Sequence, residues 1–254
     1  MKRSALAVFI SLSALTLSQS AHALSLAQVR QAGVLRLATS ADFAPFNTIT
    51  GGRISGFEVE LGDLMGKTLG LKTVWTAAPF DSLFAGLDSG KYDAVMASHA
   101  VNSTRLKLVD FARPHYCTGG VVLGRLGGPA DHKALVGRRV GAETGSTYFA
   151  YLRKLPFQKS VQLYPGSEAA IQALAFGKID AVVTDRFAAL AAIRAYPKAN
   201  LVVGEQLWNE RVAAVVGKNN TGLKDALSGA LNTLLQNGQY AALSQRYFAQ
   251  DIRC

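Results

Sequence analysis

Four short stretches of the sequence place polar or charged side chains where a small molecule could bind. GKYDAVMAS ends with Ser98, VNSTR with Arg105, ETGST with Thr147 and GKIDAVVTD with Asp185. ETGST precedes a predicted helix, so its hydroxyls and backbone N–H groups can receive an anion. Purely structural roles are equally open at this point. Asp185, Ser146 and Thr147 are of types that commonly cap helices, and Arg105 has the character of a solvated surface residue.

Two of these stretches, residues 90–98 and 177–185, are near copies of one another. In each, a Gly-Lys turn and an aspartate lead into a short run of alanine, valine or methionine, and a helical pattern precedes the turn. This order predicts a helix, a tight turn and a buried strand in each half of the chain. Ligands of open parallel sheets bind beyond the carboxyl ends of the strands. Ser98 and Asp185 should therefore lie at the mouths of two similar lobes, and two facing mouths would form one cleft.

The rest of the chain alternates between predicted strands and helices. Strands are expected at 34–40, 71–78, 121–124, 137–143, 161–165 and 211–218. Helices are expected at 57–70, 146–155, from about residue 168, and at 186–196, 223–236 and 240–248. Such alternation predicts an α/β fold with mainly parallel sheets that helices cover on both faces.

The N-terminus has the pattern of a secretory signal peptide. Two basic residues precede an apolar stretch that ends near Leu17, and the small-x-small triplet AHA ends at Ala23. The apolar stretch is shorter than the roughly 20 residues that cross a membrane. We expect cleavage after Ala23, which removes residues 1–23 and exports a soluble product.

Charge and motifs exclude several classes of function. The formal net charge is +10, but the basic residues are scattered and no aromatic-basic module accompanies them, so nucleic acid is not an expected partner. MGKTLG lacks the earlier glycine of a phosphate loop, and no G-x-G-x-x-G follows a strand. G-x-S-x-G is also absent. The histidines of the mature chain do not stand at ligand spacing with a cysteine, so we expect neither a metal nor another cofactor.

The two cysteines, Cys117 and Cys254, are expected to form a disulfide bond. In an oxidising compartment such a pair is more often a disulfide than a metal site or a nucleophile. The bond would join the last residue of the sequence to its middle. The alternative is two free thiols, one of them on a frayed tail.

Together these motifs resemble those of bacterial extracellular solute-binding proteins of the polar amino-acid type, the periplasmic components of ABC importers. The matching stretches, in the family's order and spacing, are LRLATSADFAPFN, GFEVELGDLMGKTLG, FDSLFAGLDSGKYDAVMAS, STRLKLVDFARPHY, VGAETGST and GKIDAVVTD. The resemblance implies a two-lobed periplasmic-binding-protein fold, each lobe a mainly parallel sheet flanked by helices, with the ligand cleft between the lobes. It also implies periplasmic binding of a small amino acid, or a closely related solute, and its delivery to an inner-membrane ABC permease.

The resemblance assigns roles to residues of the cleft. Arg105 matches the arginine that clamps the ligand α-carboxylate, which suits a planar guanidinium. Asp185 matches the acid that pairs with the α-ammonium. Ser98 and Thr147 match hydroxyl positions that bind the α-amino and α-carboxylate groups. The residues implied to lie against the apolar part of the ligand are Phe43 and Phe80.

Four positions bear on specificity: Ser40, His99, Ala100 and Glu143. Binders of basic amino acids often have an acid in place of Ser40, so Ser40 argues against a lysine or arginine side chain. Glu143 and His99 stand where the family is often apolar or neutral. Glu143 is expected either to meet a cationic or hydrogen-bonding group of the ligand or to point to solvent. Ala100 replaces a frequent serine or threonine, where the backbone N–H can still serve.

Two functions from different classes are compatible with this fold. Exported cyclohexadienyl dehydratases share the resemblance and eliminate water and a carboxylate from prephenate or arogenate, which needs a general acid. Glu143 is the one candidate acid. The pair of Arg105 and Asp185 suits an intact amino acid, so we expect a monomeric binding protein and not an enzyme.

The expected path of the chain divides it into two lobes joined by a hinge. Lobe 1 is expected at residues 24–117 plus 211–254 and lobe 2 at 118–210. The final helices would then pack on lobe 1, which permits Cys254 to approach Cys117 at the hinge.

Overall fold

The computed structural model describes residues 23–254. The expected signal peptide lies outside the described residues, apart from Ala23. Within the described part of the chain, no helix combines the length and the apolar character that crossing a membrane requires.

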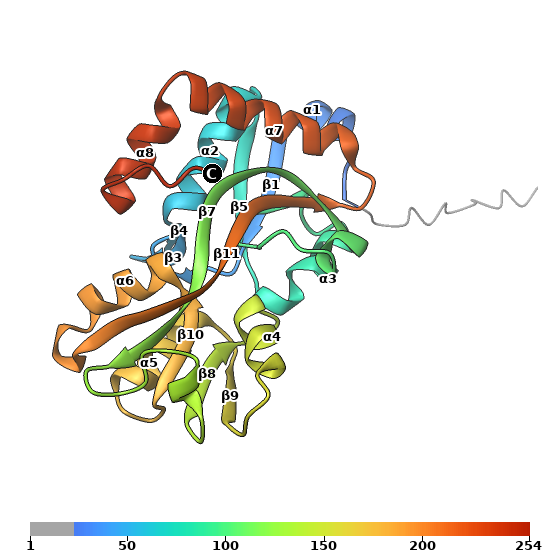
Figure 1. The fold of residues 1–254 in the computed structure, drawn as a ribbon. Helices are drawn as coiled ribbons and strands as arrows, with labels where there is room; N and C mark the ends of the chain where they lie inside the picture. The colour runs from blue at the N-terminus through green and yellow to red at the C-terminus, as the bar shows by residue number, and fades with distance from the viewer. Residues whose placement is uncertain (1–22) are drawn as a thin grey trace, which may run out of the picture.

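The protein is a two-lobed α/β fold (Figure 1). Its strands are β1 (Val34–Thr39), β2 (Asp42–Phe43), β3 (Asn47–Thr50), β4 (Arg53–Ser55), β5 (Lys72–Ala77), β6 (Ala94–Val95), β7 (Val109–Arg125), β8 (Arg139–Glu143), β9 (Ser160–Tyr164), β10 (Ala181–Asp185) and β11 (Leu201–Gly217). Its α-helices are α1 (Leu26–Ala32), α2 (Phe57–Thr68), α3 (Leu83–Asp88), α4 (Thr147–Lys154), α5 (Ser167–Ala175), α6 (Arg186–Ala195), α7 (Thr221–Gln236) and α8 (Gln239–Phe248).

Two long antiparallel strands, β7 and β11, run through both lobes (Figure 1). On one side of this pair β5, β1 and β6 are parallel, and on the other side β10, β8 and β9 are parallel. The strand order is therefore continuous, β5-β1-β6-β11-β7-β10-β8-β9. The expectation of a short strand at 121–124 was wrong in length, because this segment is the end of a strand of 17 residues.

The two near-copies occupy corresponding places in the two lobes. Each begins with a turn at a glycine of positive φ (Gly90 and Gly177) and continues into a strand, and a helix precedes each turn, as predicted. The strand of the first copy, β6, pairs antiparallel with β11, and that of the second copy, β10, pairs antiparallel with β7. The copies differ in length, because β6 has two residues and β10 has five.

Helices cover the parallel strands of each lobe. In one lobe α1 packs on β1, α2 packs on β5 and α7 packs on β7 and β11, while α8 packs on α2 and α7. In the other lobe α4, α5 and α6 pack on β8 to β10 (Figure 1). Helix α2 packs closely on β5, because a Cβ added at Gly62 would lie 2.6 Å from the ring of Trp75. Glycine in this helix is therefore explained by close approach, although it lowers helix propensity.

The disulfide bond between Cys117 and Cys254 is present, with the two Cα atoms 4.8 Å apart. The C-terminal tail runs to it beside β7, and the Cys117 backbone N–H donates to the Ile252 carbonyl at 3.0 Å. Ile252 is buried, which anchors the tail. The prediction of this bond from two isolated cysteines is confirmed.

Candidate functional site

A small enclosed cavity of about 10 Å³ lies between the two lobes. Its wall comes from segments far apart in the sequence: β2, the turns after β5 and β6, the end of β8 and the start of α4. The lining residues are Phe43, Phe80, Ala97, Ser98, Arg105, Glu143, Ser146, Thr147 and Tyr148. The structure thus brings together five of the six predicted ligand-binding residues and the predicted specificity residue Glu143.

Arg105 is the cation of this cavity, and it reaches from one lobe to the other. Its Nη1 donates to the Ala100 carbonyl at 3.0 Å, and its Nη2 donates to the Gly145 carbonyl at 3.3 Å across the cleft. The guanidinium lies over the ring of Phe80 with its Cζ 5.5 Å from the ring centroid. Burial lowers the pKa of Arg105, and nearby Glu210 partly offsets this effect. The contacts leave the guanidinium facing a space where a carboxylate could bind.

The start of α4 faces Arg105 across the cavity. The Ser146 side chain caps this helix by accepting from the Phe149 N–H at 3.1 Å, and Thr147 is its first residue. The first turn of a helix has backbone N–H groups without intrahelical partners, which stabilise an anion. Residues at the start of α4 can therefore cap the helix and also contact a ligand.

Glu143 ends β8 and points into the cavity instead of solvent. It is 4% exposed, and its Oε1 has no hydrogen-bond partner within residues 23–254. Burial raises the pKa of Glu143 well above its usual value, and the charges of Asp42 and Asp81 act in the same direction. A buried carboxyl group with a free oxygen is costly unless something pairs with it. The cleft therefore offers Glu143 to a hydrogen-bond donor or a cation.

Asp185 stands at the end of β10, as predicted, but among the described residues it lines neither this cavity nor its larger neighbour. It caps α6, because its Oδ1 accepts from Phe187 N–H at 2.6 Å and Ala188 N–H at 3.1 Å, and its Oδ2 accepts from Thr118 Oγ1 at 2.6 Å. Burial raises the pKa of Asp185 to about 7 in spite of these hydrogen bonds. The sequence left open whether Asp185 caps a helix, and the structure shows that it caps α6.

The other three specificity candidates lie outside the small cavity. Ser40 donates to Asn47 Oδ1 at 2.9 Å. His99 is buried against the ring of Phe80, with centroids 4.2 Å apart, and burial lowers the pKa of His99 well below its usual value. Ala100 lines the larger cavity and supplies the carbonyl that holds Arg105.

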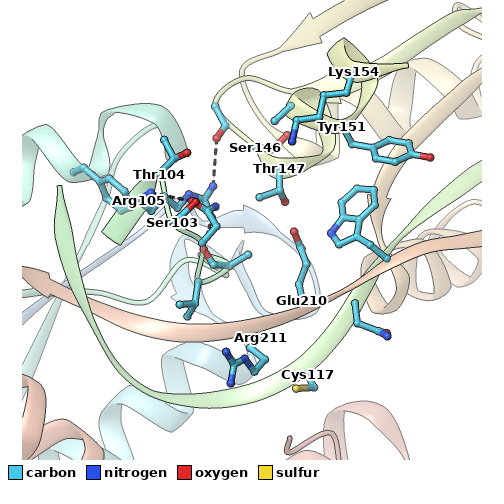
Figure 2. Close-up of a pocket in the computed structure, with 18 residues that line it drawn as sticks. Ser103, Thr104, Arg105, Cys117, Ser146, Thr147, Tyr151, Lys154, Glu210 and Arg211 are labelled. Atoms are coloured by element: carbon cyan, nitrogen blue, oxygen red, sulfur yellow. Dashed lines mark hydrogen bonds between the residues drawn. The ribbon is translucent and has the colours of Figure 1, made fainter. Parts of the chain in front are cut away.

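The larger cavity, of about 930 Å³, adjoins the small one and shares Arg105, Ser146 and Thr147 with it. Figure 2 shows the 101–105 loop on one side, α4 on another, and β11 with β7 below. Glu210, which is 9% exposed, points from β11 toward the start of α4 (Figure 2). Tyr151 and Trp208 stack at its edge, with ring centroids 4.7 Å apart.

Sequence reasoning missed three residues of this region: Glu58, Tyr148 and Glu210. A signal existed for Glu58, since its spacing in the sequence puts it on the buried face of α2 together with Leu61 and Met65. Tyr148 follows the predicted Thr147 directly. Glu210 carried no signal, because the middle of β11 was not predicted as a strand.

Comparisons with known proteins find relatives over most of the chain. A sequence profile described as bacterial extracellular solute-binding proteins, family 3, matches residues 35–250. L-cystine-binding protein TcyJ of Escherichia coli (strain K12) is 29% identical over 229 residues, which cover 89% of this chain and 86% of that protein.

Two solved structures are similar over most of the chain. An ancestral arginine-binding protein bound to arginine has a TM-score of 0.82 and 30% identity, covering 85% of this chain and 98% of that one. An ancestral amino acid-binding protein, a precursor of cyclohexadienyl dehydratase, has a TM-score of 0.80 and 25% identity, covering 87% and 98%.

Proposed function

Because the chain belongs to the bacterial extracellular solute-binding proteins, family 3, we propose that it binds an amino acid between its lobes and delivers it to an ABC importer. The observation that carries this proposal is the position of Arg105, buried in the cleft and in contact with both lobes. A carboxylate that replaces the Gly145 carbonyl as its partner would join the lobes through charge-assisted hydrogen bonds.

We assign the α-carboxylate to Arg105 and the start of α4, with Thr147. The α-ammonium is assigned to Ser98 and to the carboxylate of Asp185, and the rings of Phe43 and Phe80 enclose the apolar part. The cavity of about 10 Å³ holds no more than a water-sized molecule. The lobes must therefore separate further to admit an amino acid than they do in this arrangement.

Glu143 narrows the class of ligand. Its free oxygen favours a ligand whose side chain carries a hydrogen-bond donor or a cation. The names of the relatives include binders of L-cystine and of arginine. Ser40, where binders of basic amino acids often have an acid, argues against a lysine or arginine side chain.

The test is a thermal-shift screen of the twenty amino acids with L-ornithine and L-cystine, followed by calorimetry. Binding of one or more is expected. Glu143→Gln should retain affinity for a neutral donor and lose it for a cation, and Glu143→Leu should lose both. Equal affinities in wild type and Glu143→Leu would remove Glu143 from the site.

A second function, cyclohexadienyl dehydratase activity, is favoured by one observation: Glu143 is a buried acid in the cleft, and burial raises its pKa well above the usual value, the direction that suits a general acid. We favour binding without catalysis, because the named relatives are binding proteins. Incubation of the purified protein with prephenate and arogenate distinguishes the two functions, since turnover of either compound would establish dehydratase activity.

The remaining proposals concern the form of the exported protein. We propose cleavage after Ala23, a periplasmic monomer, and lobes formed by residues 24–117 plus 211–254 and by 118–210.

Mass spectrometry of the exported protein tests the cleavage site, and light scattering tests the monomer. Small-angle scattering should show a smaller radius of gyration with ligand, and an identical profile would contradict hinge closure.

A further inference from the structure

Ser98 has a backbone that needs external support. Its φ is +57°, in the left-handed region that residues other than glycine seldom occupy. Two hydrogen bonds from Ser98 hold it: its N–H donates to Glu58 Oε1 at 2.9 Å, and its hydroxyl donates to Glu58 Oε2 at 2.8 Å. Both bonds end on one carboxylate beneath the cleft.

Glu58 is completely buried and surrounded by donors. In addition to Ser98, Asn47 Nδ2 donates to its Oε2 at 3.0 Å, and His115 Nε2 lies 2.9 Å from its Oε1. A carboxylate accepts only, so the His115 Nε2 must carry a proton here. The four contacts occupy both oxygens of Glu58.

The direction of these bonds is fixed by the backbone. Asn47 Oδ1 accepts from the Ala41 N–H at 2.9 Å and from Ser40 Oγ at 2.9 Å. A reversed Asn47 amide would place its NH₂ group against the Ala41 N–H and lose that bond, so its NH₂ group must face Glu58. A chain of donors from Ala41 through Asn47 thus keeps Glu58 an acceptor.

The single proton of the Ser98 hydroxyl is consequently committed to Glu58. Toward the cleft, Ser98 Oγ can offer only lone pairs. An ammonium group can donate to one of these lone pairs, whereas a ligand without an α-amino group cannot.

We propose that Glu58 is a positioning residue for recognition of the α-amino group: by fixing the hydroxyl of Ser98 as an acceptor, it makes the cleft select amino acids over their des-amino analogues. This inference rests on the proposed function. Glu58 lies outside the cavity lining, so it acts through Ser98.

The test compares affinities for matched pairs of probes: L-arginine with 5-guanidinopentanoate, and L-cystine with 3,3′-dithiodipropionate. In Glu58→Gln an NH₂ group replaces one of the two oxygens, each of which now accepts hydrogen bonds. Where this NH₂ group faces the Ser98 hydroxyl, it donates to the hydroxyl oxygen. The hydroxyl proton then has no acceptor at residue 58 and turns toward the cleft. The preference for the amino acid over its analogue should fall about 10- to 100-fold, the range of a charge-assisted hydrogen bond.

A matched control is Glu60→Gln, two residues along the same helix, where the exposed carboxylate contacts Arg246 and Tyr247. The Glu60→Gln protein should prefer the amino acid over its des-amino analogue by the same factor as wild type. Ser98→Ala should show the same fall as Glu58→Gln, and the double variant should show no additional fall.

Equal weakening of both members of a pair in Glu58→Gln would indicate a merely structural role and overturn the inference. If Glu58→Gln does not fold, an unchanged preference in Ser98→Ala overturns it instead. Wild type that binds neither amino acids nor analogues would contradict the proposed function, and the inference with it.

Discussion

Burial changes the charge states of several side chains around the cleft. The pKa of Glu143 and of Asp185 is raised by burial, and that of His99 is lowered, so His99 is neutral at pH 7. Arg105 keeps its charge because a guanidinium is protonated at any physiological pH. The cleft thus combines the positive charge of Arg105 with buried acids that a positive partner would stabilise. A zwitterion satisfies both.

Arg105→Ala should weaken binding of any α-amino acid by about 2 to 5 kcal/mol, because it removes a buried charge-assisted pair. Calorimetry measures this loss. Lys107→Ala, an exposed change in the same turn, should leave affinity unaltered. An Arg105→Ala protein with wild-type affinity would exclude Arg105 as the carboxylate partner.

Asp185 should make the ligand-free protein less stable as pH rises. Below the usual value of 3.8 the group is protonated in both folded and unfolded chains. Between 3.8 and about 7 the unfolded chain releases the proton and the folded protein retains it. The free energy of unfolding therefore falls across this window, by about 4 kcal/mol at most.

Asp185→Asn, which keeps the cap because its Oδ1 can still accept from α6, should flatten this pH dependence in thermal unfolding scans. Asp88→Asn, at an exposed position of α3, serves as control. A slope unchanged by Asp185→Asn would contradict the raised pKa.

Much of the site could be predicted at this scale. Ser98 and Arg105 follow a strand end, and the rule for parallel sheets brings such positions to the cleft. The sequence could not reveal which way Glu143 points, because a strand end faces either cleft or solvent according to the twist of the sheet. It also could not show that Glu58 reaches Ser98, since that contact depends on the packing of α2.

Among the secondary-structure elements, β7 and β11 are the two that run through both lobes. These strands pack closely against each other. A Cβ added at Gly120 of β7 would lie 2.3 Å from the ring of Trp208 on β11. The Trp208 ring in turn stacks on Tyr151 of α4, the helix whose start lines the ligand cavity. The ring of Trp208 therefore connects the strands that join the lobes to the helix that lines the cavity.

Gly120→Ala should displace Trp208 and lower the free energy of unfolding by about 1 to 3 kcal/mol, the range for overpacking. Ligand affinity should fall as well, because α4 moves with Trp208. Denaturant unfolding and calorimetry measure the two effects.

Gly229→Ala is the opposite control. Gly229 lies in α7 with no atom within 4 Å of an added Cβ, so this change should stabilise by about 0.4 to 1 kcal/mol. If Gly120→Ala left the free energy of unfolding unchanged, the Trp208 ring would have to move aside without loss of stability.

Helices and short parallel strands were largely predictable because their apolar periodicity is regular, as in α2 and β1. The two long strands were not. β11 contains register shifts between Val203 and Gln206 and between Gln206 and Trp208, and each shift breaks the alternation on which prediction depends. For this reason the sequence predicted separate lobes and missed the continuous sheet.

The whole molecule is cross-linked by one covalent bond in addition to the peptide chain. Cys117 and Cys254 are 137 residues apart in sequence. In the chain-entropy model, closing a loop of this length stabilises the folded state by about 4 to 5 kcal/mol.

The double variant Cys117→Ser, Cys254→Ser should therefore unfold at lower denaturant concentration with ligand affinity nearly unchanged, since neither sulfur touches the small cavity. Alkylation followed by mass spectrometry confirms that the non-reduced wild type has no free thiol. Detection of two alkylated cysteines in the denatured wild type would refute the bond in solution.

The same bond has a consequence for proteolysis. Everything from β8 to α8 lies inside the loop that it closes. A protease that cuts a surface turn anywhere in this loop produces two chains that remain attached through sulfur. On a non-reducing gel such a nicked protein migrates as one molecule, and the fragments separate only after reduction. Damage to the second half of the molecule can thus occur without release of any part of it.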